Sequence, residues 1–135
     1  MPSGVCPAFY DTTPSDVSKI VSADIIISFG STQMEPWFAD LLEYNSDAYL
    51  IECKNMGEWN IPSGAKKYIE HLTNELSDFL PELNLTIQEN SEFYLNEIDE
   101  KSLELQDLLE HNGFQNTSVI CMQWQEDFLC KERNI

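Results

Sequence analysis

The feature that most constrains the fold is an amphipathic segment near the middle of the chain. Its large apolar residues recur with the spacing of one face of an α-helix, and they are Tyr68, Ile69, Leu72, Leu76, Phe79 and Leu80. Ser63 precedes this face as a candidate N-cap, and Pro81 follows it as a stop signal. The pattern predicts a helix over residues 64–80. An apolar helix face has to be covered by a second layer of structure.

The candidates for that second layer are short apolar runs bounded by turn residues. Runs at 25–29 and 49–51 predict buried strands, and residues 16–23 predict a short helix before them. After Pro81, apolar and polar residues alternate over 83–88, and an apolar run resumes at 93–95, which together predict a β-hairpin.

The last part of the chain predicts a second helix and a final strand. A stripe of leucines indicates a helix over 99–112, ended by Gly113, and 119–124 predicts a strand. The segment 35–44 fits either a helix beginning near Pro36 or one arm of a hairpin, and both readings stay open.

These elements predict an α+β fold in which one mixed β-sheet packs against two main helices, at about 64–80 and 99–112. A chain of 135 residues is the usual size of one domain, so we expect a single domain over 1–135. Within it, 1–15 is expected to be an irregular N-terminal arm and 131–135 a frayed tail.

Charge excludes several function classes. The chain has 24 Asp and Glu against 7 Lys and Arg, a formal net charge of −17, which disfavours direct binding to nucleic acid or to an anionic membrane. No apolar run approaches the roughly 18 residues of a membrane span, and the N-terminus lacks the pattern of a secretory signal. The expected location is therefore the cytoplasm. Four scattered cysteines without a Cys-x-x-Cys pair indicate free thiols.

The acidic residues gather on the predicted second helix, on a side away from its leucines. They form the expected partner-binding surface, which consists of Glu97, Glu100, Glu104, Asp107 and Glu110. Such a surface is suited to a basic protein, because opposite charge steers association and selects the partner. In size and charge the chain resembles bacterial toxin-immunity proteins and phage-encoded mimics of nucleic acid. The resemblance implies an acidic inhibitor, without catalysis or cofactor, that occludes a basic toxin or nuclease domain.

A second resemblance supplies the alternative. Asp40, Glu52 and Lys54 are spaced like the metal-binding core of the PD-(D/E)XK nucleases, in which an acid lies on one strand and Glu-x-Lys ends the next. Glu52 and Lys54 would share one face of a strand, where carboxylates could hold Mg²⁺ and the ammonium group could stabilise phosphate. The resemblance implies a Mg²⁺-dependent nuclease or an inactive relative. His71 and His111 are assigned structural roles, and no metal site is expected outside this alternative.

Overall fold

The computed structural model describes residues 6–29, 35–54, 59–114, 117, 118, 120 and 130. The chain packs into two compact units, Met1–Asn55 and Met56–Ile135. A division into packing units does not decide whether the units fold separately, so the single domain over 1–135 stays a prediction.

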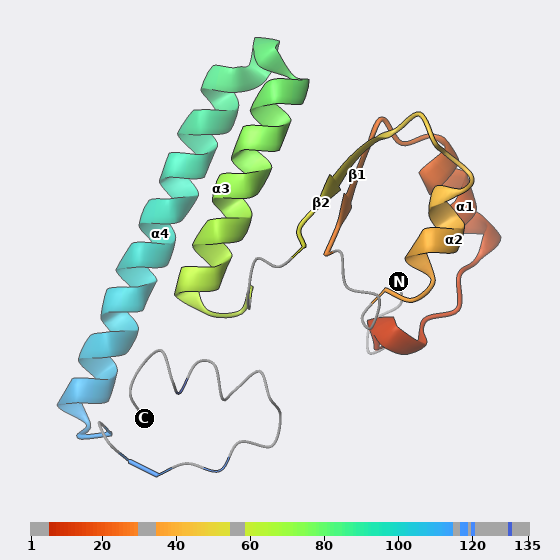
Figure 1. The fold of residues 1–135 in the computed structure, drawn as a ribbon. Helices are drawn as coiled ribbons and strands as arrows, with labels where there is room; N and C mark the ends of the chain where they lie inside the picture. The colour runs from red at the N-terminus through yellow and green to blue at the C-terminus, as the bar shows by residue number, and fades with distance from the viewer. Residues whose placement is uncertain are drawn as a thin grey trace. The chain divides into compact units, whose positions relative to one another are not determined.

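The first unit is built around two parallel strands. Its elements are η1 (Pro7–Phe9), α1 (Pro14–Val21), β1 (Ile25–Ser28), α2 (Phe38–Leu42) and β2 (Tyr49–Glu52) (Figure 1). β1 and β2 pair in parallel, with Ile25 opposite Tyr49 and Ser28 opposite Glu52. The core of the unit is small, and its buried residues are Ile26, Ser28, Leu41, Ile51 and Cys53.

Local hydrogen bonds determine where α1 begins. Pro14 occupies the first turn, where the missing N–H of proline is harmless. The backbone N–H and the hydroxyl of Thr13 donate to Asp16 Oδ2 at 2.9 and 2.7 Å, and the Tyr10 hydroxyl donates to the same oxygen at 2.6 Å. The Asp16 carboxylate therefore joins the segment before the helix to its first turn.

Asn45 explains why the segment before β2 turns without forming a hairpin. Its side-chain amide donates to the backbone carbonyls of Ile20 and Ala23, at 2.8 and 2.9 Å. Its side-chain oxygen accepts the backbone N–H of Ala48 at 3.1 Å. The turn after α2 is thus attached to the end of α1, and β2 then runs parallel to β1.

The second unit is a helical hairpin made by α3 (Pro62–Phe79), η2 (Pro81–Leu83) and α4 (Asn84–His111), and Figure 1 shows the two long helices side by side. The prediction of a helix over 64–80 is confirmed, although the helix begins two residues earlier, at Pro62, and Ile61 rather than Ser63 is its N-cap residue. Pro81 ends it as expected, because proline cannot continue the helical hydrogen bonding. At the far end of α4, Gly113 has a φ of 68°, and the N–H of Phe114 donates to the carbonyl of Leu109 at 3.0 Å. The predicted glycine-ended helix is therefore also confirmed.

The predicted fold class is wrong. The described residues contain a two-stranded parallel sheet and are mainly helical, whereas a mixed sheet packed on two helices was expected. The predicted hairpin over 83–95 is wrong, because Leu83 ends η2 and residues 84–95 form the first turns of α4. The predicted helix over 99–112 is the second half of that same helix.

Of the remaining predictions about single elements, some are confirmed, one is decided between its two alternatives, and some lie outside the described residues. Strands at 25–29 and 49–51 are confirmed with small shifts, and the short helix at 16–23 begins two residues earlier, at Pro14. The segment 35–44 takes the helical alternative over Phe38–Leu42. The predicted arm over 1–15 holds a single 3-10 turn in its described part, and the start of α1. The predicted strand at 119–124, apart from residue 120, and the tail at 131–135 lie outside the described residues.

Candidate functional site

The five carboxylates of the predicted partner-binding surface all lie on α4 and are all exposed. Three of them, Glu104, Asp107 and Glu110, line one open hollow together with Leu108 and His111. The structure therefore brings the second half of the predicted surface together. Its role in binding is not tested by the fold and stays a prediction.

Lys101 supplies a positive charge within this surface. Its ammonium group donates to both carboxylate oxygens of Glu104, at 2.9 and 2.8 Å. The hydrogen bond to Glu104, followed by the charges of Glu104, Glu97 and Glu100, raises the pKa of Lys101. Because both partners are exposed, the ion pair adds little to stability and mainly reduces local repulsion.

The three residues of the nuclease alternative are not arranged as expected. Glu52 is the last residue of β2 and Lys54 lies beyond it, so the two do not share a strand face as expected, although their side chains form an ion pair of 2.6 Å. Asp40, however, is an exposed residue of α2 and lies on no strand. Because this segment forms α2, the strand that was expected to carry Asp40 is not formed.

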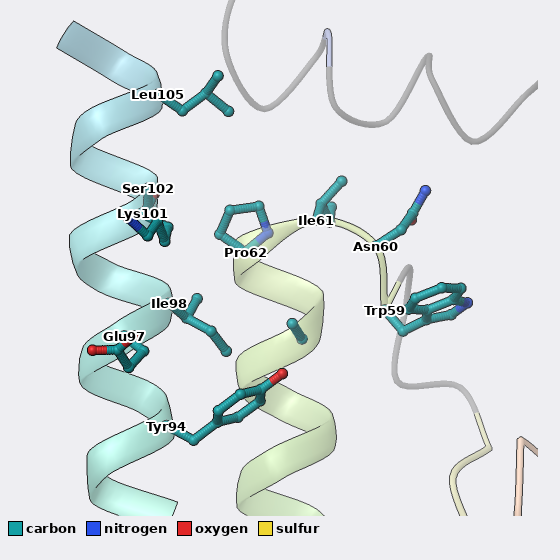
Figure 2. A pocket seen from close by; sticks show the side chains of 11 residues that line it. Trp59, Asn60, Ile61, Pro62, Tyr94, Glu97, Ile98, Lys101, Ser102 and Leu105 are labelled. Carbon is teal, nitrogen blue, oxygen red and sulfur yellow. The ribbon is translucent and has the colours of Figure 1, made fainter. Parts of the chain in front are cut away.

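A groove lies between the first turns of α3 and the middle of α4, with a volume of about 480 Å³ (Figure 2). Ile61, Pro62, Ile98 and Leu105 make it largely apolar, and Glu97 and Lys101 lie at its polar side. Figure 2 shows Tyr94 and Ile98 projecting from α4 toward α3. The sequence reasoning missed this groove because it read residues 93–95 as a strand. The spacing of Tyr94, Ile98 and Leu105 would have indicated it.

The described residues do not assemble a metal site. None of their His, Cys, Asp and Glu side chains form a group of three or more that could hold an ion. His71 lies on α3 close to Thr73, which contacts Ser91, whereas His111 lies at the end of α4. At 1.5 Å per residue these positions are roughly 27 Å apart along the hairpin. The two histidines therefore cannot ligate one ion within a single hairpin.

Comparisons with known proteins identify what the chain resembles. A family model described as "Zinc-uptake complex component A periplasmic" (ZnuA) matches residues 1–123. The crystal structure of the metal-dependent lipoprotein YcdH from Bacillus subtilis superposes with a TM-score of 0.80 at 19% sequence identity. The match covers all of this chain and 55% of that one, so the present chain spans about half the length of the solved structure. At this identity the likeness shows the fold. No curated protein matches the chain.

These findings overturn the predicted function. An acidic inhibitor of a toxin or a defence nuclease is wrong, and so is the nuclease alternative, because the family match runs through nearly the whole chain and describes an uptake component. Net charge misled the prediction, since an acidic surface occurs on many unrelated folds.

The predicted partner and location are corrected by the same match. A basic toxin or nuclease domain is not the partner of a zinc-uptake component, and the matched family is periplasmic, not cytoplasmic. Among the described helices, none combines the length and the apolar character needed to cross a bilayer.

Proposed function

Since the chain belongs to the family of periplasmic zinc-uptake components, we propose that it acts in metal-ion uptake as a binding component and not as an enzyme. The family match over residues 1–123 is the observation that carries the proposal. The fold shared with a metal-dependent lipoprotein supports it.

In this role the metal ion is cargo, with Zn²⁺ as the first candidate. Zinc in proteins is usually held by four ligands drawn from Cys, His, Asp and Glu. Because the described residues bring no three such groups together, we assign them the role of scaffold. The proposal places the cargo ligands, at least in part, beyond the described residues.

The partner that we propose is the permease of an ABC transporter. The chain would deliver the metal ion to this permease outside the cytoplasm. The broad negative field of a chain with a net charge of −17 supports a role in attracting cations, because such a field raises their local concentration.

Zinc uptake by the native host tests the proposal. Deleting the gene should slow ⁶⁵Zn²⁺ accumulation and growth in the presence of a zinc chelator, and added zinc should restore growth. Complementation with the native gene should restore uptake. The matched control is Ile51→Asp, which places a charge at a site that is 1% exposed and should fail to complement because the first unit unfolds. Equal ⁶⁵Zn²⁺ accumulation with and without the gene would remove the proposal.

The two histidines provide a second test of where the cargo is held. Since they lie far apart on the hairpin, the double variant His71→Ala/His111→Ala should complement the deletion as well as the native gene. Loss of ⁶⁵Zn²⁺ uptake in a double variant that still folds, judged by circular dichroism, would show that the scaffold assignment is wrong.

A further inference from the structure

The end of α4 carries an Asn-Gly step, Asn112 followed by Gly113, and it is the single such step in the chain. Asparagine is among the chemically labile residues of proteins, and a following glycine removes the steric barrier to its main reaction because glycine has no Cβ. In that reaction the backbone nitrogen of the glycine attacks the side-chain carbonyl carbon of the asparagine and closes a succinimide ring. Such a step is a site of spontaneous modification where its surroundings leave both groups free.

The surroundings of this step are open. Asn112 and Gly113 are both exposed. Among the described residues, no heavy atom other than those of its chain neighbours lies within 4 Å of the point where a side chain on Gly113 would begin. Asn112 lies just beyond α4, with a φ of −92° and a ψ of 1°. Ring closure requires rotation about the backbone of Asn112, and the hydrogen bonds of the last helical turn are what oppose it.

Long hydrogen bonds hold the two backbone nitrogens at this step. The N–H of Gly113 donates to the carbonyl of Glu110 and the N–H of Asn112 donates to the carbonyl of Leu108, each at 3.2 Å, the long end of the usual range. Helix ends fray, so the Gly113 nitrogen becomes free whenever the last turn opens. The side-chain nitrogen of Asn112 also donates to the Leu108 carbonyl, at 2.7 Å, and so satisfies one of the terminal carbonyls of α4.

Two other asparagines serve as internal references, because a small residue, serine, follows each of them. The side chain of Asn45 is held at both ends, since its amide and its oxygen are both hydrogen-bonded to backbone groups. Asn90 lies inside α4, and Ser91, which follows it, is buried. At both positions the two reacting groups meet only if the surrounding structure unfolds. Of the three, Asn112 is the one that the fold leaves free to react.

From these observations we infer that Asn112 is a site of spontaneous deamidation and that its conversion releases the last turn of α4. The Gly113 nitrogen loses its proton to the solvent and bonds to Cγ of Asn112, the bond from Cγ to Nδ2 breaks, and ammonia leaves. Water then opens the ring to aspartate or isoaspartate. The product has an oxygen in place of the nitrogen that donated to Leu108, and two acceptors repel one another. Its negative charge also opposes the partial negative charge at a helix C-terminus. The inference is independent of the proposed role in metal uptake.

Prolonged incubation of the folded protein at mildly alkaline pH, followed by peptide mass spectrometry, provides the direct test. The peptide that contains Asn112 should gain about one dalton and separate into an aspartate and an isoaspartate form. The peptides that contain Asn45 and Asn90 should keep their mass. The matched control is Asn112→Gln, which keeps a side-chain amide but closes a ring much more slowly, and its peptide should show no gain.

Amide hydrogen exchange tests the consequence for α4. The N–H groups at positions 112–114 should exchange severalfold faster in the converted protein than in fresh protein. Asn112→Asp, which carries the product charge from the start, should show the same increase, and Asn112→Gln should exchange more slowly than Asn112→Asp. An Asn112 amide that survives the incubation, or conversion of Asn45 or Asn90 as fast as that of Asn112, would overturn the inference. Equal exchange at 112–114 in Asn112→Asp and the native protein would overturn the release of the last turn.

Discussion

At the scale of single residues, the most informative group is the Asp16 carboxylate. Hydrogen bonds from Tyr10 and Thr13 lower its pKa from 3.8 to about 2. The same contact with Asp16 raises the pKa of Tyr10. Tyr10 also packs edge-to-face against Trp37, with ring centroids 5.7 Å apart. The Asp16 carboxylate therefore connects the segment before α1 to the first turn of the helix. Tyr10, which donates to this carboxylate, also packs against Trp37.

The lowered pKa predicts how acid affects the first unit. Because the pKa of Asp16 in the folded protein lies below its ordinary value, the carboxylate stabilises the fold fully above about pH 4. This contribution is lost as the pH falls toward 2. Asp16→Asn should therefore be less stable than the native protein at neutral pH, and the difference should shrink between pH 4 and pH 2. Urea unfolding across this range measures it.

The control for this prediction is Asp11→Asn, since none of the described residues forms a hydrogen bond with the Asp11 side chain. Its stability should follow that of the native protein at every pH. A difference between Asp16→Asn and the native protein that stays constant from neutral pH to pH 2 would contradict the role assigned to Asp16.

At the scale of elements, the contact between α3 and α4 contains a buried polar pair. The hydroxyl oxygens of Thr73 and Ser91 lie 2.7 Å apart, and the Thr73 hydroxyl also bonds to the carbonyl of Ile69 at 2.7 Å. Both residues are buried. Lys66 of α3 forms an ion pair with Asp99 of α4 at the exposed side of the hairpin. The helices are thus held in register by side-chain hydrogen bonds as well as by apolar contact.

The buried pair predicts a non-additive pattern of stability. Thr73→Val leaves the Ser91 hydroxyl buried without Thr73 as its partner, so it should lower the free energy of unfolding by about 1–3 kcal/mol. The double variant Thr73→Val/Ser91→Ala removes both hydroxyls and should recover most of that loss. A double-mutant cycle by urea unfolding checks this, and strictly additive losses would contradict it.

Ser91 of this pair is one reason why the sequence did not predict α4 as a single long helix. The residues of α4 that are half-buried or buried recur at helical spacing along its whole length, and they are Ile87, Ser91, Leu95, Ile98, Ser102, Leu105, Gln106 and Leu109. Two of these positions are serines, so the apolar stripe is interrupted where the helices approach closely. Leu83 and Leu85, which suggested a strand with Ile87, are exposed and not part of the stripe. Tertiary packing therefore overrides a local alternation of only a few residues.

At the scale of the whole molecule, charge is the dominant property. With a net charge of −17, the chain repels itself in the compact state more than in the unfolded state. Most of the described ion pairs are exposed, and two of the four join residues three apart on one helix. Such pairs offset little of the repulsion.

This balance predicts that salt stabilises the protein. Because salt screens exposed charges, the melting temperature should rise by several degrees between about 10 mM and about 500 mM NaCl at neutral pH. Near the isoelectric point of about 4.1 the net charge vanishes, and the same salt increase should have little effect. Thermal unfolding at both pH values tests the prediction, and a salt effect of equal size at the two would contradict it.

The candidate site was predictable only in part. Placing Glu97, Glu100, Glu104, Asp107 and Glu110 on one helix needed only local pattern, and all five lie there. Glu52 and Lys54 form an ion pair as close neighbours in sequence can, but Lys54 lies beyond the end of β2 and the two do not share a strand as expected. The place of Asp40 could not be derived, since a short helix and a strand fit the same apolar spacing in 35–44. Function was inferred from charge, which does not specify a fold or a site.

By itself, the sequence determined the elements whose signals are local: the strands β1 and β2, the helix α3 with its proline end, the glycine at the end of α4, and the net charge. Only the tertiary structure decided that α4 begins at Asn84 and that the strands pair in parallel. The physical reason is that strand pairing and helix contact join residues distant in sequence, and their free energy outweighs local preference over short segments.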